Sequence, residues 1–428
     1  MKSRPYRAMR VKDVELEKVR WKRDGKAVSV GTDVSKGELV MMARWGPESY
    51  ERPWKAENPG GIHELVALLK GLGEGREMGV AMEPSGTYGD PLRQALTEAG
   101  IPVYRVSPKA SRDYSEIFDG VPSQLDGKDC GVVAELHAHG KSRPWPYVRL
   151  AEPEEEFRYR VANMAAHDKM LTAWVGRIEG LLGRHWPEAS QYLRPSSATL
   201  LKVLAEYGGP AGVAEAGEEA EKRIQEWGGH FVEKETAWSL VRSARETVGL
   251  KYTDRVRDWI REWAGEALEQ REVIEAQRRK LAQLAEGNET IRRMISAVGL
   301  ACACAIWVDM GDPHSYDSPE AFRKAMGLNL KVRESGESKG QLKLAKRGSA
   351  RVRMYLYFAA LRMLWDTDVK AWYERKVERS NGKKMGAIVA IMRKLALATH
   401  CVAVKGVEFD PGKLFCETKK KRPEKAGR

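Results

Sequence analysis

The spacing of apolar residues divides the chain into stretches of different character. Over residues 27–150 short apolar runs alternate with amphipathic stretches, as strands and helices do in an α/β domain. The helix near residue 90 has Asp90 as its N-cap, Pro91 as its first residue and Gly100 just past its end. We predict strands over 27–33, 38–45, 78–83 and 102–106, and further helices over 61–72 and from near Asp126.

Two later stretches, 154–186 and 260–284, carry apolar residues at the 4-3 spacing of heptads. The positions are Phe157, Val161, Met164, Leu171, Val175, Ile178 and Leu182, then Ile260, Trp263, Ala267, Ile274, Leu281 and Leu284. Polar residues interrupt the seam at Asp168, Gln270 and Gln277. This pattern predicts helices that pair, within the chain or between chains, although an ordinary helical bundle explains it equally well.

The last part of the chain, residues 291–428, is predicted to be mostly helical. Ser318 and Pro319 begin a helix that Gly327 ends, and Ser349 can cap the next one. We therefore expect a basic N-terminal extension over 1–26, an α/β domain over 27–150, a helical or coiled-coil region over 151–290, and a mostly α domain with a basic tail over 291–428.

The net charge of the chain indicates which kind of partner it binds. The chain has 428 residues, is 42% hydrophobic and carries a formal net charge of +13. Such an excess favours a polyanion, nucleic acid before an anionic membrane, while a solvated basic surface explains the charge about as well. Five cysteines are too few for a disulfide framework, and we find neither a membrane span nor a secretory signal. These features predict a cytoplasmic protein.

Four carboxylates stand at positions where they can converge. Asp33 and Glu83 end predicted strands, and Asp126 and Asp129 lie three apart on a predicted helix. Hard oxygen ligands of this kind suit Mg²⁺ or Mn²⁺. Two such ions about 4 Å apart can stabilise the attacking and leaving oxygens of a phosphodiester displacement. Any one of these acids alone is more often a turn former than a ligand.

A serine in the last domain stands among basic residues. Ser335 precedes Gly336 in a segment, 331–353, that holds eight basic and two acidic residues. Arginines there could stabilise a pentacovalent phosphate if the hydroxyl were activated, although a flexible surface loop is the simpler explanation. The basic residues are Lys331, Arg333, Lys339, Lys343, Lys346, Arg347, Arg351 and Arg353.

Several motifs resemble one family in the right order. GTDVSK (31–36), MEPSGTY (82–88) and LDGKD (125–129) are similar to the RuvC-like, ribonuclease H-fold domain of the DEDD transposases of bacterial insertion sequences. These are the bridge-RNA-guided recombinases, related to the Piv/MooV invertases. AMGL (325–328), ESG (334–336), AKRG (345–348), NGKK (381–384) and MRKL (392–395) resemble the transposase domain of the same family, and 295–308 resembles its helix-hairpin-helix-like segment.

The resemblance implies a function and its residues. Asp33, Glu83, Asp126 and Asp129 would be the metal ligands, and Ser335 the nucleophile that forms a covalent phosphoserine link to DNA. It further implies a guide (bridge) RNA, donor and target DNA, and a dimer that assembles to a tetramer. The protein would then act in the bacterial cytoplasm, in association with the nucleoid. The nucleic-acid-binding residues would include Lys383, Lys384, Arg393 and Lys394 besides the basic segment.

Three alternatives remain open at this point. A metal-dependent RuvC-like nuclease would use water in place of the serine. A non-catalytic nucleic-acid-binding protein would keep only the basic surface. Ser338 is a rival nucleophile, but it lacks the following glycine.

Overall fold

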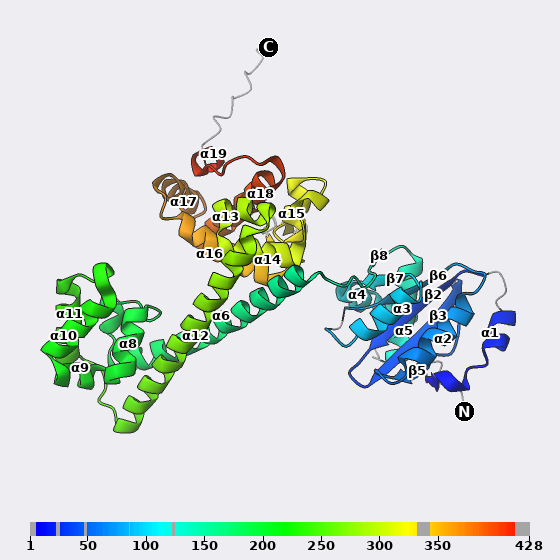
Figure 1. Cartoon of the computed structure of the whole chain (residues 1–428), viewed down its shortest axis with the longest axis horizontal. Helices are drawn as coiled ribbons and strands as arrows, with labels where there is room; N and C mark the ends of the chain where they lie inside the picture. Colours follow the sequence, from blue (N-terminus) through cyan, green and yellow to red (C-terminus); the bar gives the residue numbers. More distant parts are fainter. Residues whose placement is uncertain are drawn as a thin grey trace, which may run out of the picture. The chain divides into compact units, whose positions relative to one another are not determined.

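We describe the protein from a computed structural model. It describes residues 6–22, 26–46, 49–84, 86–121, 125–331 and 343–415. Contacts divide the chain into two compact units, residues 1–150 and 151–428, and each is described by itself (Figure 1). The finer division at residues 26 and 290 stays a prediction.

A mixed sheet forms the centre of the first unit (Figure 1). Its order is β1-β5-β3-β2-β6-β7-β8, with β4 paired to β3. β2, β6 and β7 run parallel to one another, and β3 and β8 are antiparallel to their neighbours β2 and β7. The strands are β1 (Met9–Arg10), β2 (Val28–Val34), β3 (Glu38–Gly46), β4 (Ser49–Tyr50), β5 (Trp54–Glu57), β6 (Met78–Met82), β7 (Val103–Val106) and β8 (Ser142–Pro144).

Helices cover both faces of this sheet. Alternate residues of a strand point to opposite faces, so Val28 and Val30 of β2 join the core under α2 and α3, while Gly31 and Asp33 face α5. Burial on both faces explains why the central strands are apolar at nearly every position. The helices are α1 (Leu16–Lys22), α2 (Ile62–Gly73), α3 (Asp90–Glu98), α4 (Pro108–Asp119) and α5 (Asp126–Ala138).

The described part of the N-terminal extension belongs to this unit. β1 pairs with β5, and a short 3-10 helix (Val11–Asp13) leads to α1. Val11 is buried in the same core as β2 and α2, and Leu16 packs against that core. These apolar contacts tie residues 6–22 to the sheet.

The predicted strands and helices of this unit are confirmed, with ends that differ by about one residue in several elements. The helix α3 begins one residue early, so that Asp90 lies in its first turn and Gly89 occupies the cap position. Gly100 follows the end of α3 with φ +74°, a conformation that favours glycine. The short strands β1, β4, β5 and β8, and the helices α1 and α4, are not predicted by the sequence pattern.

The two heptad stretches form the long helices α6 (Glu152–His185) and α12 (Asp254–Glu286), which pair with each other within the second unit (Figure 1). The three polar positions of the seam all have polar partners: Asp168, which bonds Tyr355, and two buried glutamines. Gln270 bonds the His167 ring at 2.6 Å, and Gln277 accepts a hydrogen bond of 3.1 Å from Arg160. The structure therefore favours pairing within the chain.

Five short helices pack at one end of this pair (Figure 1). They are α7 (Ala189–Tyr192), α8 (Ala198–Tyr207), α9 (Pro210–Ala216), α10 (Glu218–Gly228) and α11 (Lys234–Glu246), with a 3-10 turn at Gly229–Phe231.

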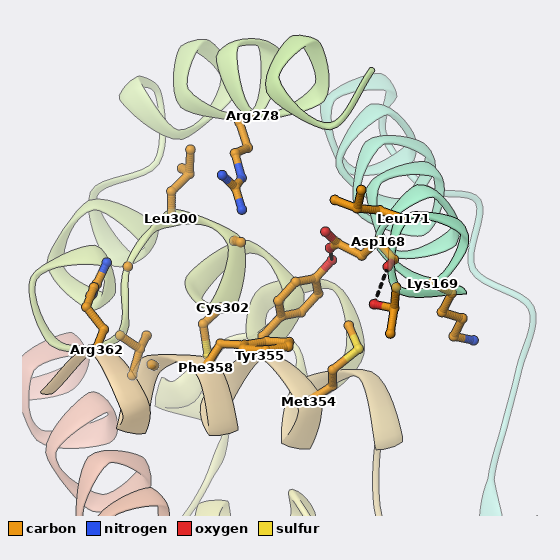
Figure 2. A pocket seen from close by; sticks show the side chains of 15 residues that line it. Asp168, Lys169, Leu171, Arg278, Leu300, Cys302, Met354, Tyr355, Phe358 and Arg362 are labelled. Carbon is orange, nitrogen blue, oxygen red and sulfur yellow. Dashed lines mark hydrogen bonds between the residues drawn. The ribbon is translucent and has the colours of Figure 1, made fainter. Parts of the chain in front are cut away.

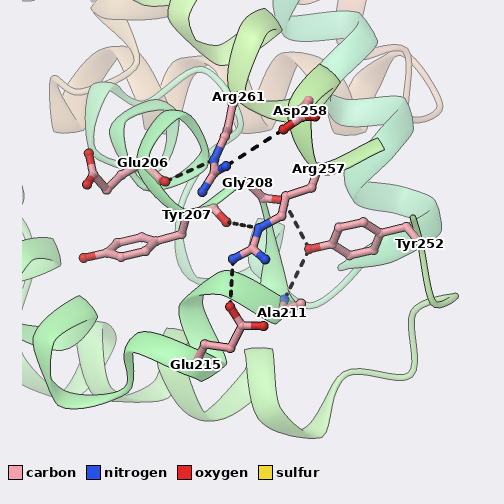
Figure 3. Close-up of polar contacts among 9 residues, drawn as sticks. All are labelled: Glu206, Tyr207, Gly208, Ala211, Glu215, Tyr252, Arg257, Asp258 and Arg261. Carbon is pink, nitrogen blue, oxygen red and sulfur yellow. Dashed lines mark hydrogen bonds and ion pairs between the residues drawn. The ribbon is translucent and has the colours of Figure 1, made fainter. Parts of the chain in front are cut away.

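Polar contacts from α12 and from Tyr252, just before it, hold the turn between α8 and α9 (Figure 3). Arg257 donates to the carbonyl of Tyr207 at the end of α8, and its Nη2 lies 2.8 Å from Glu215 on α9. Tyr252 donates to the carbonyl of Gly208 at 3.1 Å. A cation beside the last carbonyls of a helix is the favourable placement.

The remaining helices pack around α18 at the other end of the pair (Figure 1). They are α13 (Glu289–Val298), α14 (Leu300–Met310), α15 (Pro319–Ala325), α16 (Ala350–Met363), α17 (Thr367–Arg379), α18 (Lys384–Lys405) and α19 (Pro411–Phe415). A 3-10 turn (Pro313–Ser315) and a two-stranded ribbon of β9 (Leu330–Lys331) and β10 (Lys343–Leu344) complete the described part. Ser318 and Ser349 cap α15 and α16, as predicted.

The apolar helix α18 corrects one expectation. By length and composition it could cross a membrane, contrary to the expectation that no stretch could. However, 56% of its apolar window is buried inside the protein, and side chains such as Ile391 and Leu395 belong to the core of this unit. Its apolarity is therefore explained by its central position.

The contact between β2 and α5 depends on Gly31. A β-carbon there would overlap the carbonyl oxygen of Cys130 and lie 2.6 Å from the amide nitrogen of Ala134, both in the backbone of α5. By contrast, a β-carbon at Gly37 would meet nothing within 4 Å. The helix can therefore lie directly on the strand only where the strand has no side chain.

We predict that Gly31→Ala lowers the free energy of unfolding by about 1–3 kcal/mol or more, because the helix must move away from the strand. The control Gly37→Ala should change it by less than about 0.5 kcal/mol. Urea denaturation of both variants measures the difference. Equal effects at the two positions would contradict the close packing.

Candidate carboxylate site and basic domain

Two of the predicted site residues lie side by side at the carboxyl ends of neighbouring parallel strands. Thr32 of β2 and Met82 of β6 are paired in register, so Asp33 and Glu83 are the next residues along each strand. Asp33 shares the sheet face of Gly31, and Glu83 shares that of Ala81, which packs in the core under α5. Both carboxylates therefore leave the sheet on the side that α5 covers.

The other two acids begin the helix that covers this face. Asp126 and Asp129 lie in the first turn of α5, one turn before the Cys130–Ala134 segment that rests on Gly31. Negative charge is stabilised at a helix N-terminus by the unpaired amides and the helix dipole. The thiol of Cys130 is buried and donates to the carbonyl of Val40, 3.1 Å away, which ties α5 to β3 as well.

The four carboxylates influence one another's ionisation. Burial, followed by repulsion from Asp33, Glu83 and Asp126, raises the pKa of Asp129 to about 6. Burial, followed by repulsion from Asp126, also raises the pKa of Asp33. Burial alone would also raise these pKa values, but the added repulsion from named neighbours indicates that the negative charges lie near one another. The structure thus brings the four predicted acids into one electrostatic cluster.

A divalent cation fits the chemistry of this cluster, although its oxygens are not arranged as a finished site. Within the described ranges, no group of three or more His, Cys, Asp or Glu side chains forms a metal-binding arrangement. A cation between carboxylates offsets their mutual repulsion and so favours their approach to ligand distance. The donor set itself, hard oxygens alone, is the one that Mg²⁺ or Mn²⁺ prefers.

Sequence reasoning missed the lysine between the two helical acids. Lys128 is fully buried, and its Nζ lies 2.6 Å from Asp119 and donates to the carbonyl of Val121. Burial would raise the pKa of Asp119, but its hydrogen bonds, first that from Lys128, lower it. The motif LDGKD does not reveal that its lysine is buried, because the partner of Lys128, Asp119, lies outside the motif at the end of α4.

A further acid of α5, Glu135, has a structural role. It accepts hydrogen bonds from Arg44 on β3 and Tyr50 on β4, and its Oε1 lies 2.8 Å from His139. Burial would raise the pKa of Glu135, but these bonds together lower it. This network holds the far end of α5 against the sheet and thereby supports the acidic end.

The predicted nucleophile, Ser335, lies outside the described residues, as do Arg333 and Lys339. On either side of it stand β9 and β10, in which Lys331 and Lys343 are directly opposite each other. Like charges at paired positions of a ribbon are unfavourable unless an anion compensates them.

Some of the predicted nucleic-acid-binding residues have partners within the chain. Arg351 pairs with Asp309, and Lys394 donates to the carbonyl of Leu414 at 2.6 Å. Arg353 donates to the carbonyl of Gly348 at 2.8 Å. Of the predicted nucleic-acid-binding residues that the structure describes, six are exposed: Lys331, Lys343, Lys346, Arg347, Lys383 and Lys384.

A pocket of about 880 Å³ lies in the second unit, between α6, α12, α14 and α16 (Figure 2). Asp168 enters it from α6 and accepts a hydrogen bond of 2.7 Å from Tyr355. Gly299, with φ +79°, joins α13 to α14 at its edge, where a β-carbon would lie 2.7 Å from Nη1 of Arg362. This is the hairpin that the sequence predicted over 295–308.

A sequence comparison with known protein families finds a match in the second unit. Residues 290–374 match the sequence model of the Transposase IS116/IS110/IS902 family. The matched residues include α13, α14, α15, the ribbon and α16, and reach into α17. No curated protein matches the chain in sequence. The family match supports an insertion-sequence transposase, with recombinase activity and DNA as its partner.

Proposed function

We propose that this chain is an RNA-guided DNA recombinase that cleaves and rejoins donor and target DNA through a covalent link to Ser335. The observation that carries the proposal is the presence, in one chain, of a transposase-family match and a four-carboxylate cluster. The family match alone supports transposition. The carboxylate cluster adds a candidate metal site for the cleavage of DNA strands.

The metal would be held by Asp33, Glu83, Asp126 and Asp129. When bound, Mg²⁺ or Mn²⁺ would stabilise the charge that develops on the oxygens of the phosphate group. The protein's own contribution is placement: two acids on paired strand ends, two on the first turn of α5, and a close helix-to-strand contact at Gly31.

The serine step conserves the energy of the phosphodiester bond. The Ser335 oxygen forms a bond to phosphorus, and the bond from phosphorus to one deoxyribose oxygen breaks. The proton that the serine hydroxyl loses balances the one that the departing oxygen takes up. Rejoining is the reverse exchange with a deoxyribose hydroxyl of another strand. Exposed cations of the domain, among them Lys346 and Arg347, can balance charge on the phosphate.

The resemblance supplies the remaining parts of the proposal. A bridge RNA would pair with donor and target DNA, so that the protein contacts mainly the backbones. In a dimer that assembles to a tetramer, the carboxylate unit of one copy would meet the serine of another. A net charge of +13 suits such nucleic-acid partners.

The carboxylate prediction uses single substitutions of Asp33, Glu83, Asp126 or Asp129 by alanine. Strand cleavage should fall at least about 100-fold, since each loses a proposed ligand. The melting temperature should not fall, because each change removes a repelling charge. Glu64→Gln, at an exposed position of α2, is the matched control and should cleave as the wild type does. Undiminished cleavage in EDTA would rule out a metal site.

The serine prediction separates recombinase from nuclease. Wild-type protein with DNA, RNA and Mg²⁺ should leave a protein–DNA adduct that survives denaturing electrophoresis. Ser335→Ala should bind DNA normally yet form no adduct and cut nothing, since no other hydroxyl takes its place. Ser338→Ala is the control and should keep the adduct. If Ser335→Ala still cleaves with Mg²⁺, water is the nucleophile and the protein is a nuclease.

A further inference from the structure

Two half-buried arginines of the second unit, Arg323 and Arg393, share an unusual feature. Arg323 lies on α15 and Arg393 on α18, and these two helices pack together. The Nε of each is shielded from solvent and has no hydrogen-bond partner among the described residues. Neither guanidinium forms an ion pair within the described ranges. Sequence analysis singled out Arg393 only by resemblance, and Arg323 not at all.

Other arginines of the same unit show how such groups are normally satisfied. Arg351 pairs with Asp309, Arg293 donates to Glu289 and to the carbonyl of Ala403, and Arg353 donates to two backbone carbonyls. Against this background, the two unpartnered Nε groups are an anomaly, because buried polar groups are nearly always hydrogen-bonded.

The first unit offers a second comparison. Two more guanidinium Nε atoms there are buried without a hydrogen bond, those of Arg76 and Arg93. Arg76 lies over the ring of Trp45, and Arg93 lies over Trp145 and pairs with Asp90. Both are therefore compensated by an aromatic ring, whereas no ring stacking is found for Arg323 or Arg393 in the described part of the chain.

The two side chains also repel each other. Burial, followed by the charge of Arg323, lowers the pKa of Arg393. A guanidinium does not give up its proton in proteins, so the repulsion persists unless an anion compensates it. An anion shared by the two groups would remove the repulsion and supply acceptors for the unpaired donors at once.

We propose that Arg323 and Arg393 together bind one phosphate group of the nucleic-acid backbone. The inference rests on the proposed function, since it takes DNA or RNA as the partner. Guanidinium forks match the oxygens of a phosphodiester with two parallel hydrogen bonds each. Along the same stretch, Lys324 is exposed and Lys331 stands opposite Lys343, so a polyanion suits this surface better than a single carboxylate.

The first test measures binding to a fluorescent 30-base-pair duplex by anisotropy over a range of KCl concentrations. The double variant Arg323→Gln/Arg393→Gln should weaken binding about ten-fold at 100 mM KCl. The slope of log Kd against log salt should become shallower by about one unit, the value for one lost phosphate contact. Arg292→Gln, at an exposed arginine of α13, is the control and should stay within about two-fold of wild type. An unchanged slope in the double variant overturns the inference.

The second test separates an anion site from a structural role. Without phosphate, Arg393→Gln should melt no lower than wild type, because the substitution removes a repelled, unpaired charge. Inorganic phosphate, at ionic strength matched with chloride, should raise the melting temperature of the wild type more than that of the variant. If both single variants melt lower and phosphate shifts all proteins equally, the pair is structural and the inference fails.

The outcomes also distinguish this inference from the proposed function. Ser335→Ala should keep the affinity and salt slope of the wild type, since it removes no phosphate contact. If the salt slope is shallower in the arginine variants but the wild type forms no serine adduct, only the serine chemistry is rejected. If the adduct forms in the wild type and disappears in Ser335→Ala, but the salt slope of the arginine double variant is unchanged, only the arginine pair is rejected. A change of oligomeric state in Arg393→Gln with an unchanged slope would assign the pair to a carboxylate of a second copy.

Discussion

The candidate site depends on one close contact, the approach of helix α5 to strand β2 at Gly31. The helix backbone occupies the space where a β-carbon would otherwise lie. Only at this separation does the first turn of α5 bring Asp126 and Asp129 near the strand ends that carry Asp33 and Glu83. The buried Cys130 thiol and the Glu135 network hold the rest of the helix in the same place.

Electrostatic strain of one kind recurs in both units. The first unit gathers four carboxylates, and burial together with their mutual repulsion raises the pKa of Asp33 and Asp129. The second gathers Arg323 and Arg393, and places Lys331 opposite Lys343. Like charges held together reduce stability, and folds retain them where a ligand of opposite charge compensates. A cation for the first cluster and phosphate for the second are together what a DNA-joining enzyme requires.

Much of the first unit could be predicted because its signals are local. Short apolar runs marked the central strands, and two parallel neighbours necessarily bring Asp33 and Glu83 to the same edge. The shift of α3 by one residue reflects the uncertainty of helix ends. Two-residue strands such as β1 and β4 are too short to show alternation, so their pairing depends on contacts that the sequence does not display.

Partners distant in the sequence could not be predicted. The heptads of α6 and α12 indicated pairing, but the choice between one chain and two depends on the turn and the helices between them. The burial of Lys128 and the unpaired state of Arg323 likewise follow from neighbouring helices rather than from local spacing. Ser335 lies outside the described residues, so its role still rests on resemblance and on the family match.

The central claim is that the carboxylates around α5 hold the metal ion. Anomalous diffraction from crystals of the protein soaked with Mn²⁺ tests it most directly. The account predicts a strong anomalous peak enclosed by Asp33, Glu83, Asp126 and Asp129, and loss of that peak in Asp33→Ala. The account would be contradicted if the anomalous peak lay elsewhere in the protein. It would also be contradicted if no peak appeared at this cluster although Mn²⁺ supports cleavage.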